Sequence, residues 1–275
     1  MTARTAPGKW IRIPLYVGLG VLYLPIIFLV LSSFRVATLD SASGSWSAKW
    51  YTELPAQGQI LAAAWTSLQI AAASATLATL LGVLAALALV RLTRPTARGL
   101  LGLLAAVPLV VPPIVLGFSL LMLFVILGSV TGWPVTRGSL AIGFAHTTLG
   151  AAYVTVIVAA RLARLGTTLE EAAMDLGATP TSAFLRITLP NIFPAVLLGW
   201  MLSAFLSLND LVIASFVAGQ TSETLPMVLF AGIQAGAGEA MKPAAVFLVG
   251  VVAAGAYPAW LLLRAPGPTR TDPLV

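Results

Sequence analysis

Long apolar runs that are almost free of charged residues dominate the chain and alternate with short polar segments. The first run, 13–34, is flanked by Arg12 and Arg35, and a helix of this length reaches about 33 Å, enough to cross a bilayer. The pattern predicts an all-α integral membrane protein that forms a single domain over 1–275. Six segments are expected to span the membrane: 13–34, 60–90, 100–127, 140–160, 192–212 and 243–263.

The third of these spans is longer than a membrane requires and contains Pro108, Pro112 and Pro113. Each proline lacks the amide hydrogen that a helix would use, so a bend is expected within this span.

Composition agrees with a lipid environment. The chain is 59% hydrophobic and 9% charged, whereas soluble domains carry about 25% charged residues. It has no cysteine, which excludes disulfides, thiolate metal sites and cysteine nucleophiles. A net charge of +6 would suggest nucleic acid for a soluble protein, but in a membrane protein it is first a signal of topology. No nucleic-acid partner is therefore expected.

The 15 Lys and Arg residues are distributed unevenly across the predicted membrane. Four lie on one side: Arg35, Lys49, Arg137 and Lys242. The other 11 lie on the side of the N-terminus: Arg4, Lys9, Arg12, Arg91, Arg94, Arg98, Arg161, Arg164, Arg186, Arg264 and Arg270. Because positive charge accumulates on the cytoplasmic side, both termini are predicted to be cytoplasmic, which agrees with an even number of crossings.

The cytoplasmic segment 161–190, between the fourth and fifth spans, is the most highly charged part of the chain. Thr167 or Thr168 can cap a helix whose first turn holds Glu170 and Glu171, where the helix dipole favours acids.

Glycine and proline then delimit this helix and a second one. Gly177 is expected to end the first helix, and Pro180 suits the first turn of the second, with Phe184 and Ile187 on one face. Pro190 is expected to end the second helix before the fifth span. Two short helices should therefore protrude on the cytoplasmic side.

This segment resembles the coupling segment of the permease subunits of binding-protein-dependent ABC importers of type I. Its hallmark is Glu-Ala-Ala, three residues, Gly, and a later Ile-x-Leu-Pro. The matching positions are Glu171, Ala172, Ala173, Gly177, Ile187, Leu189 and Pro190. The resemblance implies that this coupling helix docks on an ATP-hydrolysing subunit; the alternative is a helix pair that only caps the bundle.

The chain itself is not expected to be an enzyme. It has no phosphate-binding loop, since its one Gly-Lys pair, Gly8-Lys9, is followed by Trp10. The resemblance implies two copies of an ATPase partner that binds ATP and Mg, a second permease of a different chain, and an extracytoplasmic solute-binding protein. It also implies the bacterial inner membrane, with neither cofactor nor metal on this chain. A channel and an intramembrane hydrolase are the alternatives from other classes, although the Gly-x-Ser-x-Gly elbow of many hydrolases is absent.

Within this family, the chain is most similar to the spermidine/putrescine (polyamine) permeases. The similarity lies in three stretches: 108–117, 209–216 and 224–227. Those permeases commonly have Asp-Asp where this chain has Asn209-Asp210. Permeases for ferric iron, sulfate, molybdate or phosphonate share the coupling motif and are the alternatives.

Three polar residues are candidates for the substrate path, because ionisable groups at membrane depth usually line a water-filled route. Asp210, at the outer end of the fifth span, either attracts an ammonium group or caps a helix end. Asn209 precedes it. His146, the sole histidine, lies in the fourth span as a hydrogen-bonded packing residue or a path ligand, and one imidazole cannot form a metal cage.

Overall fold

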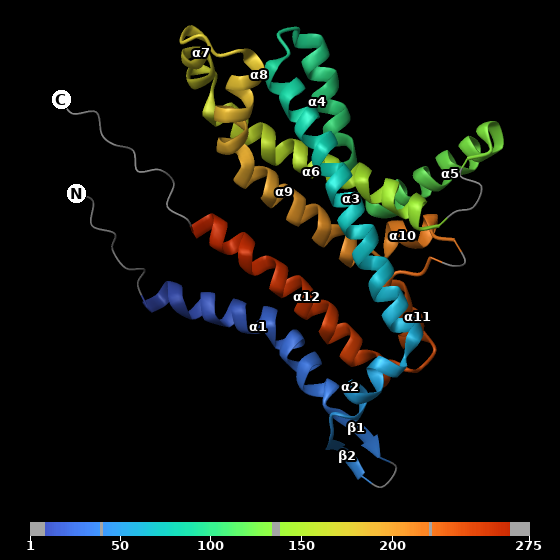
Figure 1. Cartoon of the computed structure of the whole chain (residues 1–275). Coiled ribbons are helices and arrows are strands. Elements are labelled where there is room, and N and C mark those ends of the chain that lie inside the picture. The colour runs from blue at the N-terminus through green and yellow to red at the C-terminus, as the bar shows by residue number, and fades with distance from the viewer. Residues whose placement is uncertain (1–8, 39–40, 134–137, 220–221, 265–275) are drawn as a thin grey trace. The chain divides into compact units, whose positions relative to one another are not determined.

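A computed structural model describes residues 9–38, 41–133, 138–219 and 222–264, which are almost entirely helical (Figure 1). Six helical segments are long and apolar enough to cross a membrane, so the predicted number of spans and the all-α class are confirmed. The described residues group into two compact units, 1–60 with 229–251 and 61–228 with 252–275. The single domain over 1–275 stays a prediction. The six segments are Ile13–Ser33, Gly58–Arg91, Pro113–Thr131, Ser139–Leu165, Pro180–Asn209 and Gly238–Tyr257.

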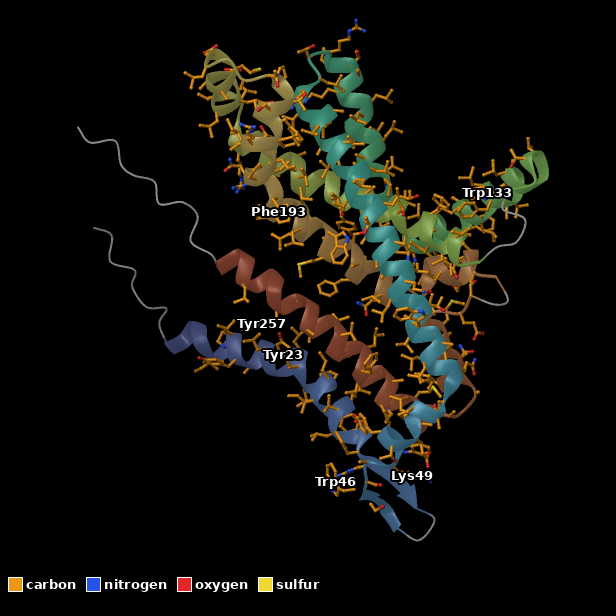
Figure 2. All side chains as sticks on the ribbon, viewed as in Figure 1. Tyr23, Trp46, Lys49, Trp133, Phe193 and Tyr257 are labelled. Atoms are coloured by element: carbon orange, nitrogen blue, oxygen red, sulfur yellow. The ribbon has the colours of Figure 1, made fainter. Side chains whose placement is uncertain are left out.

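The first unit begins with α1 (Lys9–Ser33), followed by a hairpin of β1 (Arg35–Thr38) and β2 (Ser41–Trp46) that the sequence did not predict. Arg35 pairs with Trp46 across the hairpin, and its guanidinium carbon lies 5.1 Å from the centroid of the Trp46 ring, within cation–π range. Figure 2 shows Trp46 and Lys49 close to this hairpin. The short helices α2 (Lys49–Glu53) and η1 (Leu54–Ala56) follow.

The second unit is built around α6 (Ser139–Leu165), the most buried of the six candidate spans. One apolar cluster joins α6 to the end of α3 (Gly58–Arg91) and the start of α9 (Leu189–Asn209). A second cluster joins the start of α6 to α5 (Pro113–Thr131) and α10 (Val212–Val217). The last described helices are α11 (Leu225–Gln234) and α12 (Gly238–Arg264), each of which has residues in both units.

Small residues allow α3, α6 and α9 to approach one another closely. A Cβ atom added to Gly150 of α6 would lie 2.1 Å from Oγ of Ser203 on α9 and 2.9 Å from Cβ of Ala78 on α3. A Cβ atom on Gly82 of α3 would lie 2.6 Å from Cβ of Val154 on α6. Such close contacts between small residues hold membrane helices together, because lipid provides no hydrophobic force between them.

Replacing Gly150 by valine is therefore expected to destabilise the second unit by roughly 1–3 kcal/mol, the usual cost of overpacking. Thermal unfolding of the purified protein in detergent measures this effect. Gly143→Val is the matched control on the same helix, since a Cβ atom there meets nothing within 4 Å. Equal destabilisation by the two variants would contradict this account of the packing.

The third span requires a correction, because residues 100–127 do not form one bent helix. The chain instead forms α4 (Pro95–Val110) and α5, with Val111 and Pro112 extended between them. A residue that precedes proline is disfavoured in the helical region, and both Val111 and Pro112 precede one. Pro108 is accommodated inside α4. The two consecutive prolines, and not Pro108, therefore set the break.

The fifth span also differs from its predicted bounds of 192–212. The helical segment starts at Pro180 and ends at Asn209, and Asp210 is extended. The short helices α10 and α11 after this point were not predicted. Each has ten residues or fewer, too short to be recognised against an apolar background.

Candidate functional site

The predicted helix with two acids in its first turn is α7 (Thr168–Asp175). Thr167 occupies the N-cap position, where its carbonyl accepts from the Glu171 amide at 2.9 Å, but its side chain makes no cap bond. Gly177 has φ +91°, and the two hydrogen bonds of a Schellman motif end the helix there, from Gly177 N to Met174 O (2.9 Å) and from Ala178 N to Ala173 O (3.0 Å). The predicted role of Gly177 as a helix terminator is confirmed.

The second short helix, α8 (Pro180–Ala183), begins as predicted at Pro180. Oγ1 of Thr179 accepts from the Ser182 amide at 3.3 Å and caps it. The expectation that Pro190 ends this helix is wrong. The chain passes through a π-helical turn, η2 (Phe184–Thr188), directly into α9. Proline lacks an amide hydrogen and crowds the carbonyl one turn earlier, and Pro190 lies in the first turn of α9, directly after this π-helical turn.

Exposed apolar side chains lie in α7, directly after it, and in η2, which follows α8. Leu176 is 90% exposed, and Leu169 and Leu185 are each 53% exposed. We call these three leucines, together with the exposed Glu171, Ala172 and Gly177, the α7–α8 surface. Leu169 and Leu176 are seven positions apart, about two helical turns, and exposed apolar side chains that share one face of a helix are typical of a protein interface. Figure 1 places α7 and α8 at the same end of the second unit as the turn between α3 and α4.

The remaining motif residues lie closer to the helix bundle. Leu189 packs against the apolar cluster of α3, α6 and α9, and Ala173 and Ile187 are half-buried. The carbonyl of Ile187 accepts from Nδ2 of Asn191 at 2.7 Å, while Pro190 is exposed. The motif therefore has an exposed part, which can contact a partner, and a part that anchors α9.

Asp210 lies at the opposite end of α9, where the helix breaks before α10. It lines a cavity of about 460 Å³ in the second unit, and it is the one charged residue among the described residues that line it. Irregular backbone at membrane depth is tolerated where it lines a cavity. The lining residues are Pro108, Leu109, Val111, Pro113, Leu116, Leu149, Tyr153, Phe205, Leu206, Asn209, Asp210 and Ile213.

The Asp210 carboxylate is held by three hydrogen-bond donors. Oδ2 lies 2.7 Å from the Ala214 amide and 3.1 Å from Nε2 of His146, and Oδ1 lies 3.3 Å from the Ile213 amide. Asp210 thus caps the first turn of α10, which is one of the two roles considered from the sequence, and it also lines the cavity, while attraction of an ammonium group stays a prediction. Asn209 is exposed, and its Nδ2 donates to the Phe205 carbonyl at 3.0 Å.

His146 is 4% exposed, and both of its ring nitrogens have partners. Nδ1 lies 2.7 Å from Oγ of Ser207, and Oγ of Ser74 donates to Ser207 at 3.3 Å. A carboxylate only accepts, so in a neutral imidazole Nε2 carries the proton toward Asp210 and Nδ1 accepts from Ser207. This orders a chain of hydrogen bonds from α3 through α9 and α6 to Asp210.

The grouping of Ser207, His146 and Asp210 has the residue types of a hydrolase triad. Ser207 is 7% exposed, however, and it is bonded to both Ser74 and His146 between packed helices. Of these residues only Asp210 lines the cavity described above. A nucleophile needs access to a substrate as well as a neighbouring base. The geometry therefore fits a network that positions Asp210 better than it fits a reactive serine.

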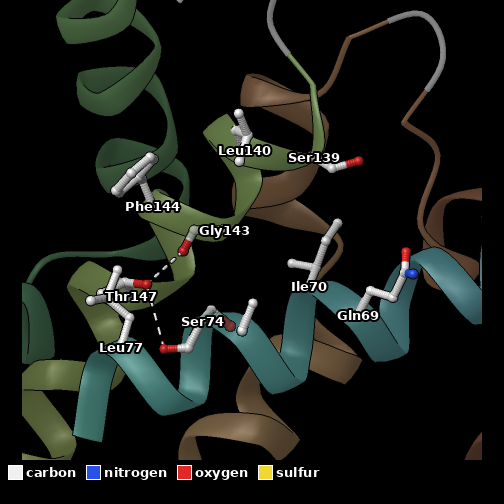
Figure 3. Close-up of a pocket in the computed structure, with 10 residues that line it drawn as sticks. Gln69, Ile70, Ser74, Leu77, Ser139, Leu140, Gly143, Phe144 and Thr147 are labelled. Atoms are coloured by element: carbon white, nitrogen blue, oxygen red, sulfur yellow. Dashed lines mark hydrogen bonds between the residues drawn. The ribbon is translucent and has the colours of Figure 1, made fainter. Parts of the chain in front are cut away.

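A second cavity, of about 240 Å³, lies between α3 and the start of α6 (Figure 3). Its lining is mainly apolar, and Oγ1 of Thr147 donates to the Gly143 carbonyl at 2.8 Å and to the Ser74 carbonyl at 3.4 Å. None of the described residues that line it is charged. Within the described ranges, no group of three His, Cys, Asp or Glu residues is placed to hold a metal ion.

Comparison with solved structures finds the same fold in chains of ABC transporters. A chain of a bacterial alginate ABC transporter superimposes with a TM-score of 0.70 at 15% identity, covering 93% of this chain and 94% of its own. The family of inner membrane components of binding-protein-dependent transport systems matches residues 78–263. The chain belongs to this family, which confirms the resemblance seen in the coupling motif and places it in the inner membrane as a multi-pass protein.

Two curated relatives match most of the chain. PotI of Escherichia coli K12, a permease protein of a putrescine transport system, is 43% identical over 93% of this chain and 91% of its own length. PotC of the same strain, a permease protein of a spermidine/putrescine transport system, is 36% identical over 83% of this chain and 84% of its own.

Proposed function

We propose that this chain is a permease subunit of an ATP-driven importer of polyamines, with putrescine as the first candidate solute. The observation that carries the proposal is the 43% identity to PotI over 93% of this chain. The cavity at the end of α9 supports it, because its one charged lining residue among those described is an acid, Asp210. A carboxylate in a partly dry cavity attracts an ammonium group more strongly than it would in water.

The proposed partners follow from the motif and from the family. The α7–α8 surface would dock on an ATPase subunit, present in two copies, which would bind ATP and Mg, whereas this chain would bind no cofactor. A second permease of a different chain would complete the path, and an extracytoplasmic binding protein would deliver the solute. Both termini would be cytoplasmic. The exposure of Leu169, Leu176 and Leu185 supports docking at this surface.

The link between ATP hydrolysis and the solute path would be the helical segment from Pro180 to Asn209. A helix of 30 residues spans about 45 Å, so it joins the α7–α8 surface to the cavity beside Asp210. Closure of the two ATPases would displace α7 and α8, and this rigid connection would carry the displacement to Asp210. Domain closure transmitted through packed helices is an established kind of switching movement.

Each candidate path residue has a distinct proposed role. Asp210 would attract the ammonium group of the solute, and Asn209 would offer it a neutral polar contact. His146 would hold the Asp210 carboxylate in place through Nε2 and would not touch the solute. The cavity is also lined by Tyr153 and Phe205, whose ring faces attract cations.

The alternative solutes fit this cavity less well. Sulfate, molybdate and phosphonate are anions that require donors or positive charge, and the charged group at the described lining is a carboxylate. Ferric iron, as a hard cation, requires several oxygen or nitrogen ligands, whereas a single carboxylate lines the described part of this cavity. A flexible diamine requires only a carboxylate and apolar or aromatic walls.

The proposal is tested by measuring ATP hydrolysis in lipid nanodiscs. The complex is purified from its native membrane through a tag on this chain and supplied with its binding protein. Putrescine, spermidine, sulfate and ferric citrate are compared as stimulants. We expect stimulation by a polyamine and not by the other solutes. Stimulation by sulfate or iron would agree with the proposed permease role but would overturn the polyamine assignment.

A further inference from the structure

An ion pair connects the end of α3 with the first turn of α7. Nη2 of Arg91 lies 2.7 Å from Oε1 and 2.8 Å from Oε2 of Glu170. The side chain of Glu170 is 14% exposed, whereas that of Arg91 is 48% exposed. The contact therefore joins a half-exposed cation to a largely enclosed carboxylate, which distinguishes it from an ordinary surface pair.

Two further contacts attach this ion pair to the turn between α8 and α9. Oγ1 of Thr188, which is 3% exposed, donates to Oε2 of Glu170 at 3.2 Å. The guanidinium carbon of Arg91 lies 5.8 Å from the ring centroid of Phe184, within cation–π range. Both partners belong to η2. Arg91 and Glu170 thus hold together three segments that are distant in sequence: α3, α7 and η2.

The orientation of α7 has to be set by contacts of this kind. The helix has eight residues, too few to be stable by itself. Its connections contain Gly166 and Gly177, which have φ of +66° and +91° and open space where a Cβ atom would lie. In addition, Nε1 of Trp200 on α9 donates to Oγ1 of Thr76 on α3 at 3.1 Å. A helix that is fixed to α3 is therefore also coupled to α9, which leads to Asp210.

We propose that Arg91 is a positioning residue for coupling, which acts through Glu170 to fix α7 to the end of α3. Displacement of the α7–α8 surface then moves α3 together with α9, and not α9 alone. The identity of the docking partner rests on the proposed function. The contact between Arg91 and Glu170 does not depend on it. Neither residue is among the seven positions of the coupling motif. The sequence indicated Arg91 only as a topology charge and Glu170 only as a first-turn acid.

The first test measures the contact without requiring transport. Spin labels at Thr93 and Asp175, both exposed, report the distance between the end of α3 and the end of α7 in the purified full-length chain. We expect Arg91→Gln and Glu170→Gln each to broaden the distance distribution, and the double variant to broaden it no further, because the two residues act through one another. Arg98→Gln, which removes an exposed positive charge on α4, is the matched control and should leave the distribution unchanged.

The second test measures the consequence in the whole complex, as molecules of ATP hydrolysed per molecule of solute transported. We expect this ratio to rise about threefold to tenfold in Arg91→Gln and Glu170→Gln, and to stay at the wild-type value in Arg98→Gln. An unchanged distance distribution in Arg91→Gln, or an equal rise of the ratio in Arg98→Gln, would overturn the proposal. If the wild-type complex shows no solute-stimulated hydrolysis, the proposed function fails, and the distance measurement still decides whether the contact positions α7.

Discussion

Replacing Leu176 by aspartate is expected to abolish solute-stimulated ATP hydrolysis and to release the ATPase subunit from the complex. Leu176 is 90% exposed at the end of α7, so the folded chain makes little use of it. At a docked interface the same position would be buried, and an unpaired charge buried there is costly. We expect at least about a tenfold loss of co-purified ATPase subunit, which corresponds to roughly 1.4 kcal/mol of affinity.

Thr96→Asp is the matched control for the added charge. Thr96 is exposed in the first turn of α4, where a helix N-terminus tolerates an acid, and the start of α4 lies at the same end of the second unit as α7 and α8 (Figure 1). Co-purification of the ATPase subunit, quantified on stained gels, should be normal with this variant. Normal association in Leu176→Asp, or equal losses in both variants, would show that the α7–α8 surface is not where the ATPase docks.

Replacing Asp210 by asparagine is expected to have the second largest effect, a fall of about tenfold or more in polyamine transport. The amide has nearly the shape of the carboxylate and keeps one acceptor oxygen for His146 or for the amides of Ile213 and Ala214. The negative charge at the cavity is lost, and with it the attraction for an ammonium group. Initial rates of radiolabelled putrescine uptake at several concentrations measure the effect, which should appear mainly as a higher KM.

Two measurements separate this loss of charge from a loss of structure. The thermal unfolding midpoint of Asp210→Asn should fall only slightly, because the amide leaves at least one of the three donors without an acceptor, and the amount of folded protein should stay close to wild type; a structural role alone would lower both strongly. Glu53→Gln, which removes a carboxylate from α2, should transport normally. Unchanged uptake in Asp210→Asn would remove Asp210 from the proposed solute path.

The number of spans and the α7 helix were predictable because their signals are strong, whereas the third span and the bounds of the fifth were predicted wrongly. An apolar run of about 20 residues forms a membrane-spanning helix in lipid, and a glycine that follows an amphipathic helical turn commonly ends the helix. Gly177 and Pro180 therefore marked their structural positions correctly. The coupling motif identified the family before any fold was known, because its spacing combines seven positions, and the family match over 78–263 confirmed that inference.

The errors arose where backbone geometry depends on neighbours in space. Pro190 follows a π-helical turn that accommodates it, so a residue that usually ends helices lies inside one. The partners of His146 come from α9 and from the break after it, far away in sequence, and a single histidine gives no indication of them. The ion pair of Arg91 with Glu170 was likewise hidden, because two charges 79 positions apart have no detectable spacing.

The most direct test of the central claim is putrescine uptake into proteoliposomes that contain the purified complex, with ATP inside and the binding protein and putrescine outside. Because the proposed ATPase subunits would hydrolyse ATP on the cytoplasmic side, only complexes whose cytoplasmic face points into the lumen would be active. We predict accumulation of putrescine in the lumen that requires ATP and is lost when Leu176→Asp replaces the wild-type chain. Accumulation without ATP would indicate a channel. ATP-dependent accumulation of an anion, with none of putrescine, would contradict the polyamine assignment.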